Sequence, residues 1–110
     1  MLRKIVDKIR SSGDVEKVLL GKILAKNISA SDQQPLSDHE FKVFSQWGED
    51  GIIQFLLKKL DLPQKTFIEF GVETYRESNT RFLLMHDNWA GLVIDGAKSN
   101  IDAIVSQSIY

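Results

Sequence analysis

Two acidic residues beside glycines are the side chains of this sequence most suited to chemistry. Glu69 comes just before Gly71 at the end of one apolar run, and Asp95 stands beside Gly96 at the end of a second run. A glycine lets the backbone come close to a ligand. A carboxylate just past the end of a strand can accept hydrogen bonds from both hydroxyl groups of a ribose. The pattern therefore favours a cofactor that contains a nucleoside.

The residues that follow Gly71 distinguish between two kinds of nucleoside cofactor. The dinucleotide fingerprint G-x-G-x-x-G holds a pyrophosphate with backbone amides. Here a single glycine is followed by Glu73 and Glu77, whose carboxylates would repel a pyrophosphate and attract a cation. S-Adenosylmethionine has a sulfonium, an ammonium group and a ribose but no phosphate, so electrostatics favours it over NAD. An enzyme that binds a nucleotide sugar or NAD through an atypical loop stays open as an alternative.

A parallel sheet would bring the two acidic residues together. Residues 66–70 are rich in β-formers and predict a buried strand, residues 80–86 a helix, residues 91–95 a second strand and residues 97–105 a further helix. This order predicts a parallel β-α-β unit with a right-handed crossover. Ligands of such sheets bind outside the carboxyl ends of the strands, where both acidic residues fall.

The predicted fold class is α/β, the start of a Rossmann-like fold. Two strands cannot build a doubly wound sheet, and an isolated pair of strands is only marginally stable. The second strand would also leave an unpaired edge. We therefore expect the first part of a larger domain, truncated after its second β-α unit, and self-association of the isolated chain through the open edge.

Composition divides the chain into a helical arm at residues 1–29, a polar linker at 30–40 and a body at 41–110. In the arm, Ser-Ser-Gly at residues 11–13 predicts a break, with Asp14 as the N-cap of a second helix. His39, in the linker, is expected to be solvated. In the body, the apolar spacing of residues 52–60 predicts a helix that ends before Pro63.

The arm is basic and the body is acidic. Residues 1–26 carry seven basic and three acidic residues, a net charge of +4, whereas residues 27–110 carry seven basic and twelve acidic residues, a net charge of −5. A basic amphipathic segment can make weak contact with an anionic membrane surface. We favour the alternative, in which the arm packs on its own domain and presents its lysines to water. The acidic body would repel phosphates, so we expect no nucleic-acid partner.

Four ordered blocks of sequence resemble the FkbM-type methyltransferases. They are FSQWGED at 44–50, FIEFGV at 67–72, SNT at 78–80 and NWAGLVID at 88–95. The resemblance covers about residues 41–105. It implies a Rossmann-like sheet that uses S-adenosylmethionine, and transfer of a methyl group to an oxygen of a sugar, glycan or other small metabolite.

The candidate cofactor-binding residues are Gln46, Asp50, Glu69, Gly71, Glu73 and Asp95. The resemblance implies that Glu69 and Gly71 belong to the cofactor loop, that Asp95 binds the ribose, and that Gln46 and Asp50 lie near the cofactor pocket. Glu73 stands where the loop usually has a second glycine, and Asp95-Gly96 replaces the more usual acid-proline pair. No residue is assigned as catalytic, because the segments expected to bind adenine and substrate would follow the second strand.

Composition also argues against other kinds of site. The chain has no cysteine, which excludes a disulfide, a thiolate metal site and a cysteine nucleophile. No His/Asp/Glu cluster has the spacing of metal ligands, so we expect no metal. No apolar run reaches the roughly 18–20 residues of a membrane-spanning helix, and the first residues lack the apolar centre of a secretory signal, so we expect a cytoplasmic protein. A non-catalytic fragment or pseudoenzyme that binds through its arm stays open as an alternative.

Overall fold

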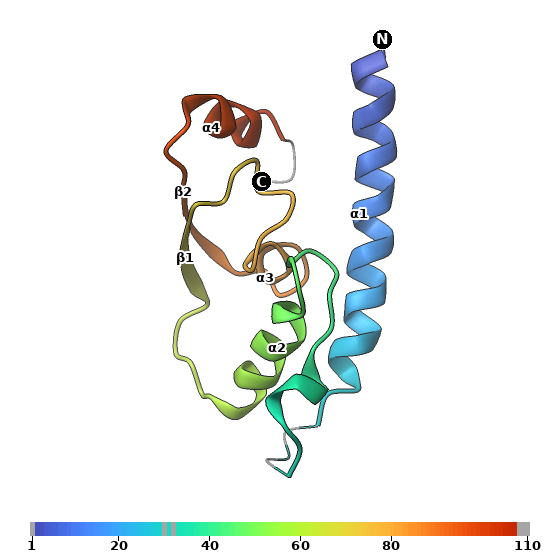
Figure 1. The fold of residues 1–110 in the computed structure, drawn as a ribbon, viewed down its shortest axis with the longest axis vertical. Coiled ribbons are helices and arrows are strands. Elements are labelled where there is room, and N and C mark those ends of the chain that lie inside the picture. Colours follow the sequence, from blue (N-terminus) through green and yellow to red (C-terminus); the bar gives the residue numbers. More distant parts are fainter. Residues whose placement is uncertain (1, 30, 32, 108–110) are drawn as a thin grey trace.

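A computed structural model describes residues 2–29, 31 and 33–107 of the chain (Figure 1). This described part is mixed α/β. Its elements, in chain order, are α1 (Leu2–Lys26), a 3₁₀ helix η1 (Leu36–His39), α2 (Glu49–Lys59), β1 (Thr66–Phe70), α3 (Arg81–Met85), β2 (Ala90–Ile94) and α4 (Lys98–Val105).

The two strands form a parallel sheet. Thr66 pairs with Ala90 at one end of the ladder and Phe70 pairs with Ile94 at the other. The ladder continues past β1, because the Gly71 N–H donates to the Ile94 carbonyl oxygen at 2.8 Å. With α3 between the strands in sequence, the predicted parallel β-α-β unit is confirmed. The Rossmann-like identity of the larger fold stays a prediction.

The sheet is covered on one face, so the prediction of a buried first strand is wrong for three of its five residues, which are exposed. Successive side chains of a strand point to opposite faces, and Phe67 and Glu69 are half-buried on the covered face. On the other face, Ile68 is 71% exposed and Phe70 79% exposed. In the view of Figure 1, α1, α2 and α3 all lie on the same side of the strands. The sequence pattern of a strand does not reveal how many layers of helix cover it.

Two apolar clusters form the core. The first joins α1 to α3 and to the segment before α2, with Ala25, Val43, Phe44 and Phe82 as its buried members. The second lies between the sheet and α4, with Val72, Tyr75 and Ile104 as its buried members. The loop that follows β1 therefore belongs to the core, because it contributes two of those three side chains.

The predicted break in the arm is wrong, since α1 continues without interruption from Leu2 to Lys26. Asp14 does not cap a helix. Its Oδ2 atom accepts a hydrogen bond from Nη2 of Arg81 at 2.9 Å, and Arg81 is only 1% exposed. This ion pair between α1 and α3 holds the middle of α1 against the body, which offsets the low helix propensity of Ser-Ser-Gly.

The predicted linker is partly folded, and the prediction of a solvated His39 is wrong. His39 is 5% exposed, and its ring stacks on Phe55 with centroids 3.9 Å apart. The chain can approach α2 this closely because Gly51 has no side chain: a Cβ atom there would lie 2.0 Å from the His39 carbonyl oxygen. The Gly51 N–H also donates to the Phe41 carbonyl oxygen at 3.1 Å.

Within residues 2–29, 31 and 33–107, no helix is both long and apolar enough to cross a membrane.

Candidate functional site

The carboxyl ends of β1 and β2 carry the two acidic residues that the sequence singled out. Glu69 lies opposite Val93 in the parallel ladder. Asp95 comes two residues after Val93, so alternation places it on the same side of the sheet as Glu69. Both side chains are half-buried. The structure therefore brings them to one end of one sheet face, beside the loop at residues 71–80.

Glu69 binds the far end of this loop. Its carboxylate accepts hydrogen bonds from the backbone N–H of Thr80 at 2.8 Å and of Asn79 at 3.3 Å. These N–H groups precede α3, and the first N–H groups of a helix have no partner inside the helix. Thr80, the N-cap residue, makes no capping bond of its own, because its hydroxyl group contacts the Tyr75 hydroxyl at 2.8 Å. Glu69 thus supplies the cap from a neighbouring strand.

Asp95 binds the near end of the loop. Its Oδ1 atom accepts the Glu73 N–H at 2.9 Å. Its Oδ2 atom accepts the Ala97 N–H at 3.0 Å and the side-chain amide of Asn100 at 2.8 Å. The hydrogen bond from Asn100, followed by those from the Ala97 and Glu73 N–H groups, lowers the pKa of Asp95 below its ordinary value. The carboxylate is consequently ionised and held in a fixed orientation at neutral pH.

The first turn of the loop has an unusual backbone. Gly71, Glu73 and Tyr75 all have positive φ angles, of 70°, 51° and 62°. This left-handed region disfavours side chains with a Cβ atom. At Gly71 the conformation rather than the available space favours glycine, since a Cβ atom would meet nothing within 4 Å. Glu73 keeps its strained conformation while donating its N–H to Asp95.

Tyr75 and Arg81 hold the loop from beneath, and the sequence did not identify this support. Tyr75 is fully buried. Nη1 of Arg81 donates to the Tyr75 carbonyl oxygen at 2.8 Å and to Oε1 of Gln107 at 3.3 Å. Nη2 of Arg81 also forms an ion pair with Oδ2 of Asp14 at 2.9 Å. One buried guanidinium therefore connects the loop to α1 and to the segment after α4.

The remaining two candidates lie close together: Gln46 is in the turn before α2, and Asp50 is in the first turn of α2. Asp50 is 1% exposed, and its Oδ2 atom accepts the backbone N–H groups of Val43, Phe44 and Ser45 at 2.8–2.9 Å. Its visible role is to fix this turn. Gln46, by contrast, is exposed at the tip of the turn. A hydrogen bond from the Ser78 N–H to the Phe44 carbonyl oxygen, 3.0 Å long, joins the turn to the loop after β1.

Glu49 stabilises the tip of the same turn. Its Oε2 atom accepts the N–H groups of Trp47 at 3.0 Å and of Gly48 at 2.9 Å. Hydrogen bonds from backbone N–H groups, its own first and then those of Trp47 and Gly48, lower the pKa of Glu49. The turn therefore presents Gln46 and the 75% exposed Trp47 on a well-held backbone.

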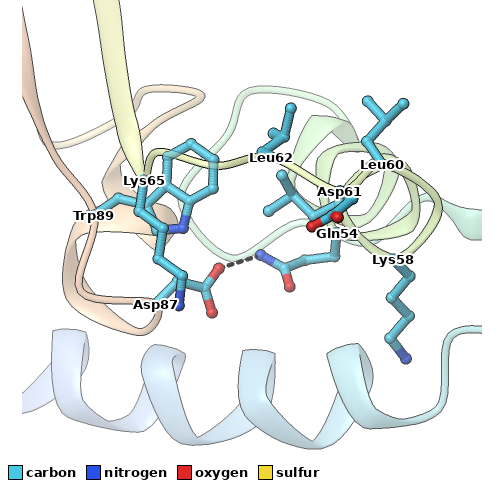
Figure 2. A pocket seen from close by; sticks show the side chains of 9 residues that line it. Gln54, Lys58, Leu60, Asp61, Leu62, Lys65, Asp87 and Trp89 are labelled. Atoms are coloured by element: carbon cyan, nitrogen blue, oxygen red, sulfur yellow. Dashed lines mark hydrogen bonds between the residues drawn. The ribbon is translucent and has the colours of Figure 1, made fainter.

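A pocket of about 310 Å³ lies at the opposite end of the sheet (Figure 2). Its walls include Lys65 and Trp89, the residues just before β1 and β2. Several of its polar groups are already bonded within the protein. Nε2 of Gln54 donates to Oδ2 of Asp87 at 2.6 Å. Nζ of Lys58 donates to the carbonyl oxygens of Ala25, in the last turn of α1, and of Ile28, just after α1. No motif in the sequence indicated this pocket, and its lining contains none of the predicted site residues.

Metal ligation finds no support among the described residues, because no group of three or more His, Asp or Glu side chains in residues 2–29, 31 and 33–107 could hold an ion. Comparisons of the chain with protein-family models, with curated proteins and with solved structures found no match. The FkbM-type resemblance of residues 41–105 therefore stays a prediction.

Proposed function

We propose that this chain forms the cofactor-binding end of an S-adenosylmethionine-dependent methyltransferase of the FkbM type, acting on an oxygen of a sugar or other small metabolite. The observation that carries the proposal is the ionised Asp95 carboxylate at the carboxyl end of β2, fixed by three hydrogen bonds. Ligands of parallel sheets bind at this end.

Asp95 retains hydrogen-bonding capacity for a ligand. A carboxylate oxygen can accept about two hydrogen bonds. Oδ2 accepts two from the described residues, whereas Oδ1 accepts one, from Glu73. One position on Oδ1 is therefore available to a ribose hydroxyl, and the half-buried side chain leaves it accessible.

The charges and the open backbone around Asp95 fit a cationic nucleoside better than a pyrophosphate. Glu73 and Glu77 are exposed in the adjoining loop, and Glu69 is half-buried behind it. A Cβ atom added at Gly71 or Gly96 would meet nothing within 4 Å, so a ligand could contact the backbone there. Carboxylates in this arrangement attract a sulfonium and an ammonium group and repel phosphates.

In this proposal, Oδ1 of Asp95 binds a ribose hydroxyl, while Glu69 and Glu73 attract the positively charged methionine end. Gly71 allows the cofactor to approach the backbone. S-Adenosylmethionine supplies an electrophilic methyl group when bound. The contribution of these residues is to bind and orient the donor, and alignment is a major source of rate enhancement in group transfer.

Calorimetric titration of the chain with S-adenosylmethionine tests the proposal. We expect Asp95→Asn to weaken binding at least tenfold, about 1.4 kcal/mol. Asn100→Ala is the matched control, because it removes a bond to the same carboxylate but leaves the carboxylate in place. Its affinity should stay within about threefold of wild type. Circular dichroism should show both variants folded.

Two results would overturn the proposal. The first is wild-type affinity for S-adenosylmethionine in folded Asp95→Asn, or no binding by the wild-type chain. The second is tighter binding of NAD or a nucleotide sugar than of S-adenosylmethionine, because the acidic loop should disfavour phosphates.

A further inference from the structure

The outward face of α1 carries a line of exposed apolar side chains. Val15, Leu19 and Ile23 recur every four residues and are 57–59% exposed. Leu20, beside them, is 51% exposed, and Leu2, eighteen residues earlier, is 75% exposed. Eighteen residues are five full helical turns, so Leu2 and Leu20 lie along one line of the helix. We call these five residues the outer stripe of α1.

The outer stripe points away from the body. The residues of α1 that face the body are Asp14, Val18, Gly21 and Ala25, of which Asp14 bonds to Arg81 and the other three lie against the core. At 100° per residue, the centre of this inner line lies about 170° from the centre of the five-residue outer stripe. In Figure 1, α1 forms one side of the molecule, with no other element beyond it. A flat surface could therefore approach the stripe unobstructed.

Basic residues border the outer stripe. Lys22 and Lys26 are exposed next to Leu19 and Ile23, and residues 1–26 have a net charge of +4. One of the three acidic residues of this segment, Asp14, is turned inward to Arg81. Glu16 is also exposed on this face, between Ile23 and Leu20. The described charges of the outward face are therefore Lys22, Lys26 and Glu16, a net charge of +1, whereas residues 27–110 have a net charge of −5.

We propose that the outer stripe of α1 binds the surface of an anionic lipid bilayer, with the helix parallel to the membrane plane. Apolar side chains of such a helix enter the boundary between headgroups and acyl chains, and lysines contact the anionic headgroups. The long lysine side chains can reach the headgroups while their stems cover apolar surface. The acidic body, on the other side of α1, would face the water.

Charge complementarity favours lipid over a second copy of the chain as the occupant of this face. A second copy offers two apolar surfaces: its own outer stripe, and the bare sheet face, whose large exposed side chains are Ile68, Phe70, Leu92 and Ile94. The stripe of a second copy would bring lysines against lysines, and these four side chains of the sheet face carry no negative charge for Lys22 and Lys26. An anionic bilayer provides both an apolar layer and negative charge.

Vesicle flotation tests the proposal with vesicles of phosphatidylcholine containing about 30% phosphatidylserine, at about 0.1 M salt. We expect the wild-type chain to float with these vesicles, and binding to fall at least tenfold with neutral vesicles or at about 0.5 M salt. The double variant Leu19→Gln, Ile23→Gln should bind at least tenfold more weakly. These side chains are exposed, so the variant should keep the wild-type circular dichroism spectrum.

Two further variants separate the contributions. Lys22→Glu with Lys26→Glu keeps the apolar stripe and should reduce binding to anionic vesicles at least tenfold, because each basic residue near such a surface strengthens binding and each acidic residue is repelled. Ile68→Gln with Leu92→Gln is the matched control. It removes two equally large exposed apolar side chains from the sheet face and should change binding less than about threefold.

Several results would overturn the proposal. They are the absence of vesicle binding by the wild-type chain, equal binding to neutral and anionic vesicles, or wild-type binding by either α1 variant. Loss of binding in the sheet-face variant alone would assign the membrane contact to the sheet. The wild-type chain could instead form an oligomer and bind no vesicles. If the Leu19→Gln, Ile23→Gln variant were then a monomer, the stripe would be an interface between copies.

Discussion

Asp50 offers the sharpest test of how this domain is held together. It is 1% exposed, and one of its oxygens accepts three backbone N–H groups, from Val43, Phe44 and Ser45. Asp50→Ala would leave these three N–H groups buried without a partner, each at a cost of about 1–3 kcal/mol. Because the three share one acceptor, we expect a total loss of roughly 3–6 kcal/mol in the free energy of unfolding. Asp50→Asn keeps an acceptor oxygen and should lose roughly 1–2 kcal/mol.

Urea unfolding followed by circular dichroism measures these losses. A domain of this size has a total stability near the lower end of about 5–15 kcal/mol. Asp50→Ala could therefore be largely unfolded, and Asp50→Asn provides the measurable intermediate case. Asp61→Ala, at an exposed position, is the control and should stay within about 0.5 kcal/mol of wild type. Our reasoning would be refuted if Asp50→Ala unfolded within about 1 kcal/mol of wild type.

Four other changes have predictable effects. Gly13→Ala should raise the free energy of unfolding by about 0.5–1 kcal/mol, since a Cβ atom there meets nothing within 4 Å. Gly21→Ala should lower it by about 1–3 kcal/mol, because its Cβ atom would lie 2.4 Å from the Phe82 ring. Urea unfolding measures both changes. A destabilised Gly13→Ala or a stabilised Gly21→Ala would contradict the corresponding prediction. The lowered pKa of Asp95 stabilises the fold above the ordinary value of 3.8, and this stabilisation is lost as the pH falls through the lower, folded-state value. The stability difference between wild type and Asp95→Asn should therefore shrink in urea titrations below about pH 4. Asn100→Ala should raise the pKa of Asp95, measured from the carboxyl carbon by NMR, and an unchanged pKa would exclude Asn100 as the main cause.

Local patterns in the sequence were sufficient to predict the secondary structure of the body. The expected strand at residues 66–70 matches β1, and the expected second strand differs from β2 by one residue at each end. The helix predicted to end before Pro63 is α2, which ends at Lys59. Alternating and three-to-four-residue apolar spacings are properties of neighbouring residues, so the sequence displays them directly.

The errors concern features that depend on distant residues. The Ser-Ser-Gly segment has low helix propensity, but α1 continues through it because Asp14 pairs with Arg81, 67 residues further along the chain. His39 stands among polar residues and is nonetheless buried against Phe55. Tertiary contacts of this kind override local propensity. No spacing rule applied to one sequence could have identified these partners.

The location of the candidate site was predictable, whereas its internal hydrogen bonding was not. Parallel topology requires that Glu69 and Asp95 lie at the same end of the sheet. The sequence did not reveal that both carboxylates bind backbone N–H groups of the loop that connects them, Asp95 at Glu73 and Glu69 at Asn79 and Thr80. Those N–H groups become visible only once the loop conformation is known.

This shared loop has a consequence for any ligand at the site. Because Asp95 orients the Glu73 N–H and Glu69 orients the start of α3, the residues proposed to bind a cofactor also stabilise the backbone that the cofactor would contact. A ligand that adds a hydrogen bond to Oδ1 of Asp95 holds the carboxylate in the orientation that accepts the Glu73 N–H, and so favours the same ordered loop. Ligand binding and loop order should therefore reinforce each other. In hydrogen exchange, the Glu73 and Thr80 amides should become more protected when S-adenosylmethionine is added. The Gly51 amide is the control and should change least, because it is bonded to the Phe41 carbonyl oxygen, outside this loop.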